Sequence, residues 1–336
     1  MRNVLLVVVI PGMLAFAAEY TTAQDTETGH IDVATMRAKW RERQAAIQSL
    51  SISWRQKTSA SQDSIQERAM RRRVATPPNE RHNDDAKLAY EQRHTLVVAG
   101  ERVSWRTTGF RPRGQAAGAG ALRPISERRV FDGEKHVSFR FTEDADGKFP
   151  QAVLQRERKQ LIADEKLFPI LLNLLPLDAD LKSLFDLTAF EPSGSTTIIA
   201  DRKCFRLVSG KRAIWVAPDA DYSIIRYAWM NDDLESASLA TTIDVERSPE
   251  GIFTPTKWST VKSGDWQSKI AVNNLEINPK IDDAEFSIIF PMDTLVIDQL
   301  AGNTKTSIVR ADGSLFPVDK ARTYKEALKL ANSQDD

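Results

Sequence analysis

The sequence predicts an α+β protein that is mostly β, built from an antiparallel sheet with one apolar helical insert. Three observations carry this prediction. Apolar residues alternate with polar ones over many short runs, and these runs are separated by Gly-, Asn- and Asp-containing turns. Residues 32–50 instead show a period of three and four, which is typical of a helix. Residues 151–190 lose the alternation and contain clustered leucines.

Composition bounds the class of protein before any motif is considered. The 336 residues include 46 basic and 46 acidic side chains, so no global field favours nucleic acid or a membrane surface. Seven Trp and fourteen Phe are too many for a disordered chain. Cys204 is the single cysteine, which excludes an internal disulfide framework and a multi-cysteine zinc site.

The N-terminus predicts export. Arg2 precedes an apolar run from Val4 to Ala18, and Ala15-Phe16-Ala17 offers the small-x-small pattern of a cleavage site. The run is shorter than the roughly 20 apolar residues that a membrane span needs. We therefore predict a signal peptide over residues 1–17, cleaved near Ala17, and a periplasmic or secreted mature protein without a stable membrane span. Residues 18–31 are polar and predict a flexible leader.

The first half of the chain predicts a helix followed by hairpins. Asp32 is a suitable N-cap for a helix, and Leu50–Trp54 alternates as a strand with one buried face. Strands over Leu88–Val98 and Arg102–Thr108 flank a turn at Gly100. Asp132-Gly133 predicts a second hairpin, between strands over 128–131 and 135–141. Residues 56–86 and 109–125 are predicted to contain exposed loops.

The second half of the sequence predicts an apolar helical segment followed by more strands. Pro169 and Pro176 divide the 151–190 insert into short helices that are apolar on too many sides for a surface position. Two interpretations of 167–175 stay open, a core helix and the lid of a cavity. The following strands are predicted over 196–200, 204–208, 213–216, 223–230, 240–246, 253–262 and 266–277. Their spacing favours an antiparallel meander over parallel βαβ winding.

The C-terminal half resembles the periplasmic lipoprotein-carrier family known as LolA-like. The resemblance rests on an apolar strand ending in Trp215-Val216-Ala217-Pro218, on the strand 223–227, and on an Asn-to-Pro pattern over 278–291. That pattern is one residue longer before its Phe than in the family, and Asp293 stands where the family usually has Gly. The resemblance implies a curved antiparallel half-barrel sheet with short helices covering its concave face.

The resemblance also implies a function without chemistry. A concave apolar face of this kind desolvates an acyl chain at about 0.8 kcal/mol per CH₂. The leading hypothesis is a carrier or binding protein for a hydrophobic ligand, a lipid or the acyl chain of an envelope lipoprotein, within one domain over 32–300 and a tail over 301–336 that holds a short helix. The predicted ligand contacts are Trp54, Phe139, Phe168, Leu171, Leu172, Trp215 and Tyr227. The alternative is an envelope sensor or protein-interaction module that uses the same fold without a ligand.

Other motifs favour plainer interpretations. Asp144-Ala145-Asp146-Gly147 begins like a calcium loop, but Val153 stands where the last ligand is needed, so we predict a hairpin turn. The four histidines have no metal-ligand spacing, and Gly-x-Ser-x-Gly is absent, so we predict no metal, no cofactor and no enzyme activity. Residues 37–113 hold 17 basic against 8 acidic side chains, which fits either a solvated sheet edge or an acidic partner.

Overall fold

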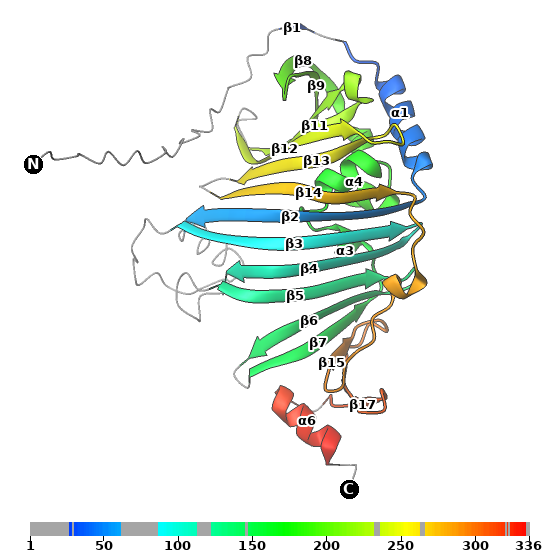
Figure 1. Cartoon of the computed structure of the whole chain (residues 1–336), viewed down its shortest axis with the longest axis vertical. Coiled ribbons are helices and arrows are strands. Elements are labelled where there is room, and N and C mark those ends of the chain that lie inside the picture. Colours follow the sequence, from blue (N-terminus) through cyan, green and yellow to red (C-terminus); the bar gives the residue numbers. More distant parts are fainter. Residues whose placement is uncertain are drawn as a thin grey trace, which may run out of the picture.

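The structure, a computed structural model, describes residues 27–28, 30–61, 87–112, 122–144, 147–231, 236–262, 266–319, 321 and 323–333. Seventeen strands of the described chain form one open, curved sheet, accompanied by short helices (Figure 1). The fold is therefore mostly β, as the alternation predicts.

The strands in chain order are β1 (Glu27–Thr28), β2 (Ser49–Ser61), β3 (Lys87–Ala99), β4 (Arg102–Pro112), β5 (Leu122–Phe131), β6 (His136–Asp144), β7 (Gly147–Gln155), β8 (Glu191–Ile199), β9 (Arg202–Ser209), β10 (Arg212–Ala217), β11 (Ser223–Met230), β12 (Ala237–Arg247), β13 (Phe253–Lys262), β14 (Gln267–Ile277), β15 (Leu295–Asp298), β16 (Lys305–Val309) and β17 (Leu315–Pro317). The helices are α1 (Val33–Ala46), α3 (Lys159–Ile162), α4 (Phe168–Leu174), α5 (Ala179–Leu184) and α6 (Tyr324–Asn332), with single 3₁₀ turns η2 (Leu187–Ala189), η3 (Pro218–Ala220) and η4 (Asp283–Phe286).

Two meanders make the sheet. Strands β2 to β7 follow one another in space, and so do β8 to β14. The pairing of β14 with β2 joins the two meanders in the middle of the sheet. Consequently β7 and β8 lie far apart across the sheet, and the chain between them must cross one of its faces.

That crossing is made by α3, α4 and α5. Helix α4 packs against β11 and β13, and α3 contacts β5. We call the sheet face against which α4 packs the insert face. The chain after β14 crosses the other face, where Phe286 of η4 clusters with Val97 and Val130. Ion pairs from Arg102 to Asp283 (2.7 Å) and from Arg106 to Glu285 (2.8 Å) fasten η4 to β4.

Helix α1 begins where the sequence predicts it. The Asp32 carboxylate accepts hydrogen bonds from the backbone N–H groups of Ala34 and Thr35, which satisfies donors of the first turn. Met36 and Trp40 are fully buried, and the Trp40 indole donates a 2.8 Å hydrogen bond to the carbonyl of Tyr222. The helix is thereby tied to the turn before β11.

Several predicted elements shift or are joined by others. Residues 151–155 belong to β7, so the helical insert begins at about Lys159 and not at 151. Arg111 and Arg123 lie in β4 and β5 and not in a loop. Glu27–Thr28, within the expected flexible leader, pairs with β8. Strand β15 pairs in parallel with β7, an exception to the antiparallel prediction.

The turns are predicted most accurately. Gly100 and Gly133 both have positive φ in the two expected hairpin connections. The predicted signal peptide and most of the leader lie outside the described residues. Among the residues that the structure does describe, no helix is long and apolar enough to cross a membrane.

Candidate functional site: the insert face and its basic notch

Helix α4 supplies the apolar part of the insert face. Every residue from Phe168 to Leu174 is buried, as the lack of a polar stripe in this segment requires. An isolated helix of seven residues is unstable in water, because short helices gain too few hydrogen bonds to offset nucleation. Packing against the sheet therefore holds α4 in place.

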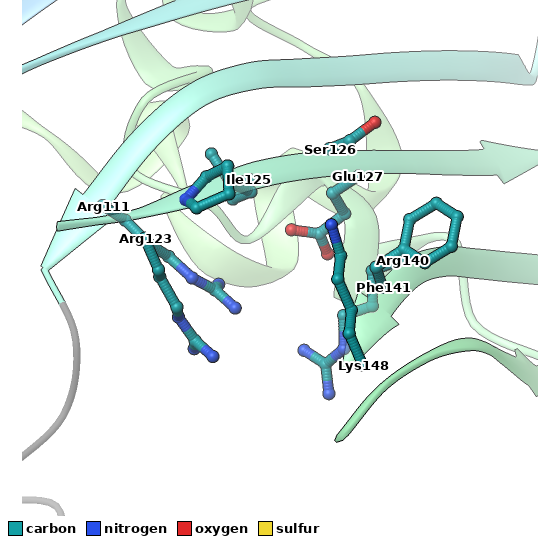
Figure 2. Close-up of a pocket in the computed structure, with 9 residues that line it drawn as sticks. Arg111, Arg123, Ile125, Ser126, Glu127, Arg140, Phe141 and Lys148 are labelled. Carbon is teal, nitrogen blue, oxygen red and sulfur yellow. The ribbon is translucent and has the colours of Figure 1, made fainter. Parts of the chain in front are cut away.

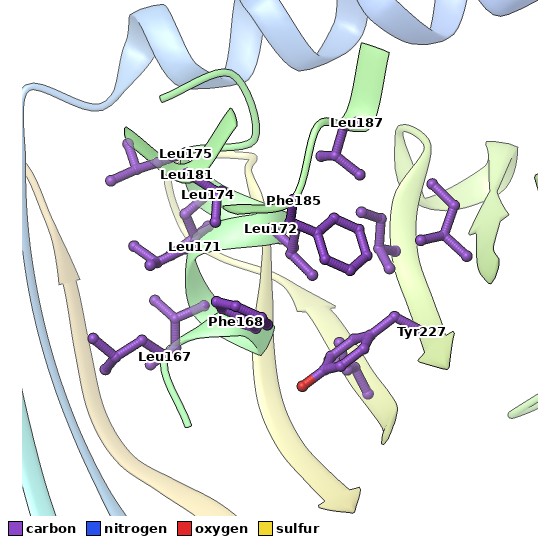
Figure 3. Packing of buried hydrophobic residues seen from close by; sticks show 14 of the residues in the cluster. Leu167, Phe168, Leu171, Leu172, Leu174, Leu175, Leu181, Phe185, Leu187 and Tyr227 are labelled. Carbon is purple, nitrogen blue, oxygen red and sulfur yellow. The ribbon is translucent and has the colours of Figure 1, made fainter. Parts of the chain in front are cut away.

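Aromatic rings fill the space between the insert and β11. The Phe168 ring lies 6.0 Å from Phe185 and 6.0 Å from Trp229, and 6.4 Å from Tyr227 (centroid distances). Figure 3 shows Phe168, Phe185 and Tyr227 directed toward one another beneath the insert. Tyr227 is 1% exposed, and burial raises the pKa of its hydroxyl well above the usual value. This part of the insert face is a packed core.

One side chain ties α4 to the sheet by hydrogen bonds. The Asn173 amide donates to the carbonyl of Ile224 (3.1 Å) and accepts from its N–H (2.8 Å). Arg43 of α1 donates to the Asn173 carbonyl at 2.8 Å, and burial lowers the pKa of Arg43 to about 10. Asn173 completes the ladder of β11 at a residue that lies beyond the paired part of β12.

Polar side chains replace apolar ones toward the centre of the sheet. Trp54, His94 and Trp105 come from the adjacent strands β2, β3 and β4. The His94 ring stacks on Trp54 (4.9 Å) and lies 6.0 Å from Trp105. The Nδ1 atom of His94 is 2.9 Å from the Thr107 hydroxyl. Aromatic and polar groups thus share one buried layer.

Four polar atoms in this layer have no hydrogen-bond partner in the structure: Trp54 Nε1, Gln56 Oε1, His94 Nε2 and Trp105 Nε1. Their side chains are at most 3% exposed. A buried polar atom without a partner costs on the order of 1–3 kcal/mol, so native proteins rarely tolerate one. We call these residues the polar row.

Lys166, in the turn before α4, brings a charge to the polar row. Its ammonium donates a 2.8 Å hydrogen bond to Gln92 Oε1, and the Gln92 amide donates to the Phe110 carbonyl. Burial lowers the pKa of Lys166, opposed by Asp164. Burial, and secondarily the Lys166 charge, holds the pKa of His94 well below its usual range. His94 is therefore neutral at physiological pH.

A direct line of paired residues leads from the polar row to a basic pocket. The cross-strand partners are Trp54, His94, Thr107, Glu127 and Arg140 on β2 to β6. Directly paired residues point to the same face. With strands about 4.8 Å apart, this line spans about 19 Å.

The basic pocket lies where β5 and β6 separate. The two strands pair from Glu127–Arg140 to Phe131–His136, whereas residues 122–126 and 141–144 have no pairing with each other. The resulting wedge has a cavity of about 120 Å³. We call it the basic notch, and it is lined by Arg111, Arg123, Pro124, Ile125, Ser126, Glu127, Arg140, Phe141 and Lys148.

Positive charge dominates the basic notch. Figure 2 shows Arg111 and Arg123 on one side of the gap and Arg140 and Lys148 on the other. The Glu127 carboxylate accepts a 2.7 Å hydrogen bond from Arg129, outside this set. Burial, and then repulsion from Arg123, lowers the pKa of Arg111. An anion in the gap would relieve this repulsion.

The predicted ligand contacts divide between the two faces. Trp54, Phe168, Leu171, Leu172 and Tyr227 lie on the insert face or in the insert, and all are at most 5% exposed. Phe139 and Trp215 lie on the opposite face, away from the other predicted contacts, because they are adjacent to Arg140 and Ile214, whose cross-strand partners Glu127 and Tyr227 lie on the insert face. Phe139 stacks on Phe290 at 6.4 Å, and Trp215 lies under the guanidinium groups of Arg206 and Arg226.

The sequence reasoning missed the basic notch. The sequence predicts an exposed loop within 109–125, whereas Arg111 of β4 and Arg123 of β5 are direct cross-strand partners in the structure. Arginine directly opposite arginine is unfavourable in a sheet. Such a pair would have been a signal for an anion site, but only once the register of β4 and β5 was known.

Metal and thiol chemistry are not visible in the described part of the chain. No group of three or more His, Cys, Asp or Glu side chains there could hold a metal ion. Cys204 is fully buried, and burial raises the pKa of its thiol to about 12. Cys204 therefore packs as a small hydrophobic residue.

Three solved structures resemble this chain. An outer membrane lipoprotein-sorting protein domain from Vibrio parahaemolyticus has 7% identity and a TM-score of 0.41, over 75% of this chain and 94% of that one. A LolA superfamily protein from Nitrosomonas europaea has 8% identity and a TM-score of 0.38, over 77% and 99%. A DUF1329 family protein from Desulfovibrio piger has 10% identity and a TM-score of 0.36, over 78% and 98%.

One of these structures is named as a LolA superfamily protein and another as a lipoprotein-sorting protein domain. No family model and no curated protein matches the sequence.

Proposed function

We propose that this protein is a non-catalytic, exported binding protein for a hydrophobic ligand, a lipid or an acyl chain, held on the insert face. The observation that carries the proposal is the polar row, a layer of unpartnered polar atoms bordering an apolar interior. An amphiphile matches this surface, because its chain replaces apolar packing and its polar end supplies partners for Trp54, Gln56 and His94.

Ligand entry requires the insert to move, because its own rings fill the space beneath it. The insert is suited to such exchange, since α3, α4 and α5 have four, seven and six residues and depend on packing for their stability. In this proposal the short helices cover the concave face of a half-barrel sheet and act as a lid. Trp54, Tyr227, Phe168, Leu171 and Leu172 contact the ligand after the exchange.

The experiment measures uptake and lid movement together. Delipidated protein is titrated with a fluorescent fatty acid and with its uncharged methyl ester, and amide hydrogen exchange is followed over residues 159–184. We expect saturable uptake of both probes and faster exchange of the insert amides in the bound state. Failure to bind either probe would overturn the proposal.

A matched pair of variants separates lid opening from general destabilisation. Leu174→Ala removes packing that holds α4 without touching a proposed ligand contact, so the open state becomes more populated and uptake should tighten about tenfold. Ile308→Ala removes a residue of equal burial from the separate C-terminal cluster and should leave uptake unchanged. Equal effects of the two variants would contradict the lid.

A second candidate is an interaction module whose interior stays closed. The packed rings of Phe168, Phe185 and Trp229 favour it, because they already occupy the expected ligand space. It predicts no probe uptake, unchanged amide exchange in the insert, and a stoichiometric protein partner that survives removal of lipid. The titration above therefore decides between the two.

A further inference from the structure

The four cations of the basic notch share one nearby carboxylate, that of Glu127. Within the described residues, none of Arg111, Arg123, Arg140 and Lys148 forms an ion pair with a carboxylate. By contrast, the neighbouring Arg129 pairs with Glu127, and Arg128 lies 3.9 Å from Glu285 on the other face. Four basic side chains around one cavity, with a single carboxylate already engaged by Arg129, leave an excess of positive charge.

The arrangement of these side chains is costly to the protein alone. Arg111 and Arg123 are directly opposite on paired strands, where like charges repel. The Nε atoms of both are buried without a hydrogen-bond partner. A charged donor left unpaired in a buried position loses the full free energy of its desolvation. Both observations point to a ligand that accepts hydrogen bonds and carries negative charge.

The geometry selects among anions. Donors approach the gap from two walls, Arg111 and Arg123 from β4 and β5, and Arg140 and Lys148 from β6 and β7 (Figure 2). A carboxylate is planar and carries one charge, which one guanidinium can satisfy. A phosphate group directs oxygens in several directions and carries more charge, and arginine forks suit it well. The backbone gap between β5 and β6 leaves room for it.

We propose that the basic notch binds a phosphate group, the head of a phospholipid whose chains lie on the insert face. This inference rests on the proposed function for the position of the chains. The line from Trp54 through His94, Thr107 and Glu127 to Arg140 connects the two parts on one face of the sheet. An amphiphile along this line meets apolar rings first, then the polar row, and its phosphate last.

The test compares two lipids that differ in the phosphate alone and whose 16-carbon chains are long enough to follow this line of about 19 Å. Dipalmitoyl phosphatidic acid and dipalmitoyl glycerol, dispersed in the same non-ionic detergent, are titrated into the full chain by calorimetry at low salt. We expect the phosphatidic acid to bind at least 100-fold more tightly, with an affinity that falls as salt is added. The double variant R111Q/R123Q should lose about 100-fold for the phosphatidic acid and nothing for the glycerol lipid.

Controls keep the proposal falsifiable. Arg41→Gln, an exposed position on α1, changes the net charge without touching the basic notch and should bind like the wild type. The double variant relieves a repulsion, and a thermal melt at least as high as the wild type's verifies its fold. Equal affinities for the two lipids, or unchanged binding of phosphatidic acid by R111Q/R123Q, would overturn the inference.

Inorganic phosphate distinguishes the source of the ligand. Displacement of phosphatidic acid by millimolar phosphate would support the basic notch as a site for a free phosphate as well. Failure to displace it, with the lipid difference intact, would support a site for lipid head groups alone. If dipalmitoyl glycerol binds as tightly as the phosphatidic acid, and R111Q/R123Q changes neither affinity, the proposed function is supported and this inference is wrong.

Discussion

Strands β10 to β13 and strands β4 to β6 belong to one sheet and bury different kinds of side chain on the same face. The first group packs Tyr227 and Trp229 against Phe168 of the insert. The second group presents Trp105, Glu127 and Arg140, and ends in the basic notch. The first region buries mainly aromatic rings that contact one another, whereas the second, with the adjacent strand β3, buries the polar atoms Trp105 Nε1 and His94 Nε2 without a hydrogen-bond partner.

The difference separates stability from recognition. Aromatic rings in contact gain dispersion energy, and their apolar surface is removed from water. The apolar region therefore stabilises the fold. Unpaired arginines and unpartnered indole N–H groups contribute nothing favourable to the fold until something binds them. We therefore expect a ligand to gain most of its binding free energy in the polar region. We expect mutations to reduce the free energy of unfolding most in the apolar region.

The largest expected effect tests this contrast with one residue type. Phe168→Ala removes a ring that lies near three others in the core, and should lower the free energy of unfolding by about 3–5 kcal/mol. Phe141→Ala, at a ring 42% exposed beside the basic notch, should cost less than about 1 kcal/mol. Denaturant unfolding of both variants measures the difference. Similar losses would mean that the two regions do not differ in packing.

Acid should weaken the polar region first. Burial, and then the charge of Arg129, lowers the pKa of His136 to about 4. In the unfolded chain this imidazole binds its proton near pH 6.5, so between about pH 6.5 and 4 the unfolded state holds more protons and stability falls as pH falls. From pH 7 to 5 the loss amounts to about 2 kcal/mol from this residue.

Substitution of His136 isolates that contribution. His136→Gln should reduce the loss between pH 7 and pH 5, while the exposed His30→Gln should keep the wild-type loss. The remaining acid dependence includes His94, whose pKa is lowered in the same direction. Urea unfolding at pH 7 and pH 5 gives, for each protein, the slope of the free energy of unfolding against pH. Identical slopes for the wild type and His136→Gln would show that His136 takes up its proton in the folded protein without cost.

Most of the sheet could be predicted from sequence because its strands have a clear period of two and turns with specific chemistry. The strands at 223–230 and 253–262 match β11 and β13 at both ends, and Asp132-Gly133 marks its hairpin. Such signals are local. Register and pairing between distant strands are not, and the β14–β2 and β15–β7 pairings left no trace in the sequence.

The candidate site was harder to predict, because the alternation of apolar and polar residues does not show which of them point to the insert face of the sheet. Trp215 has apolar neighbours on both sides in sequence, Ile214 and Val216, and Phe139 alternates with Ser138 and Arg140. Neither pattern shows which face of the sheet the insert covers. The face to which Phe139 and Trp215 point becomes known only from the strand register, which pairs Arg140 with Glu127 and Ile214 with Tyr227. The basic notch required the same register, plus the point at which β5 and β6 part.

The smallest expected effect contrasts two arginines that both point into the polar region. Arg111→Gln relieves repulsion from Arg123 and should stabilise the fold by about 0.5 kcal/mol at low salt. Arg129→Gln breaks the ion pair with Glu127 and a stack on Trp105 (4.9 Å), and should destabilise it by about 1 kcal/mol. Thermal unfolding at low and high salt measures both, and screening should shrink the gain from Arg111→Gln. A loss of stability from Arg111→Gln would mean that Arg111 already has a partner. That result would contradict the proposal of an anion in the basic notch.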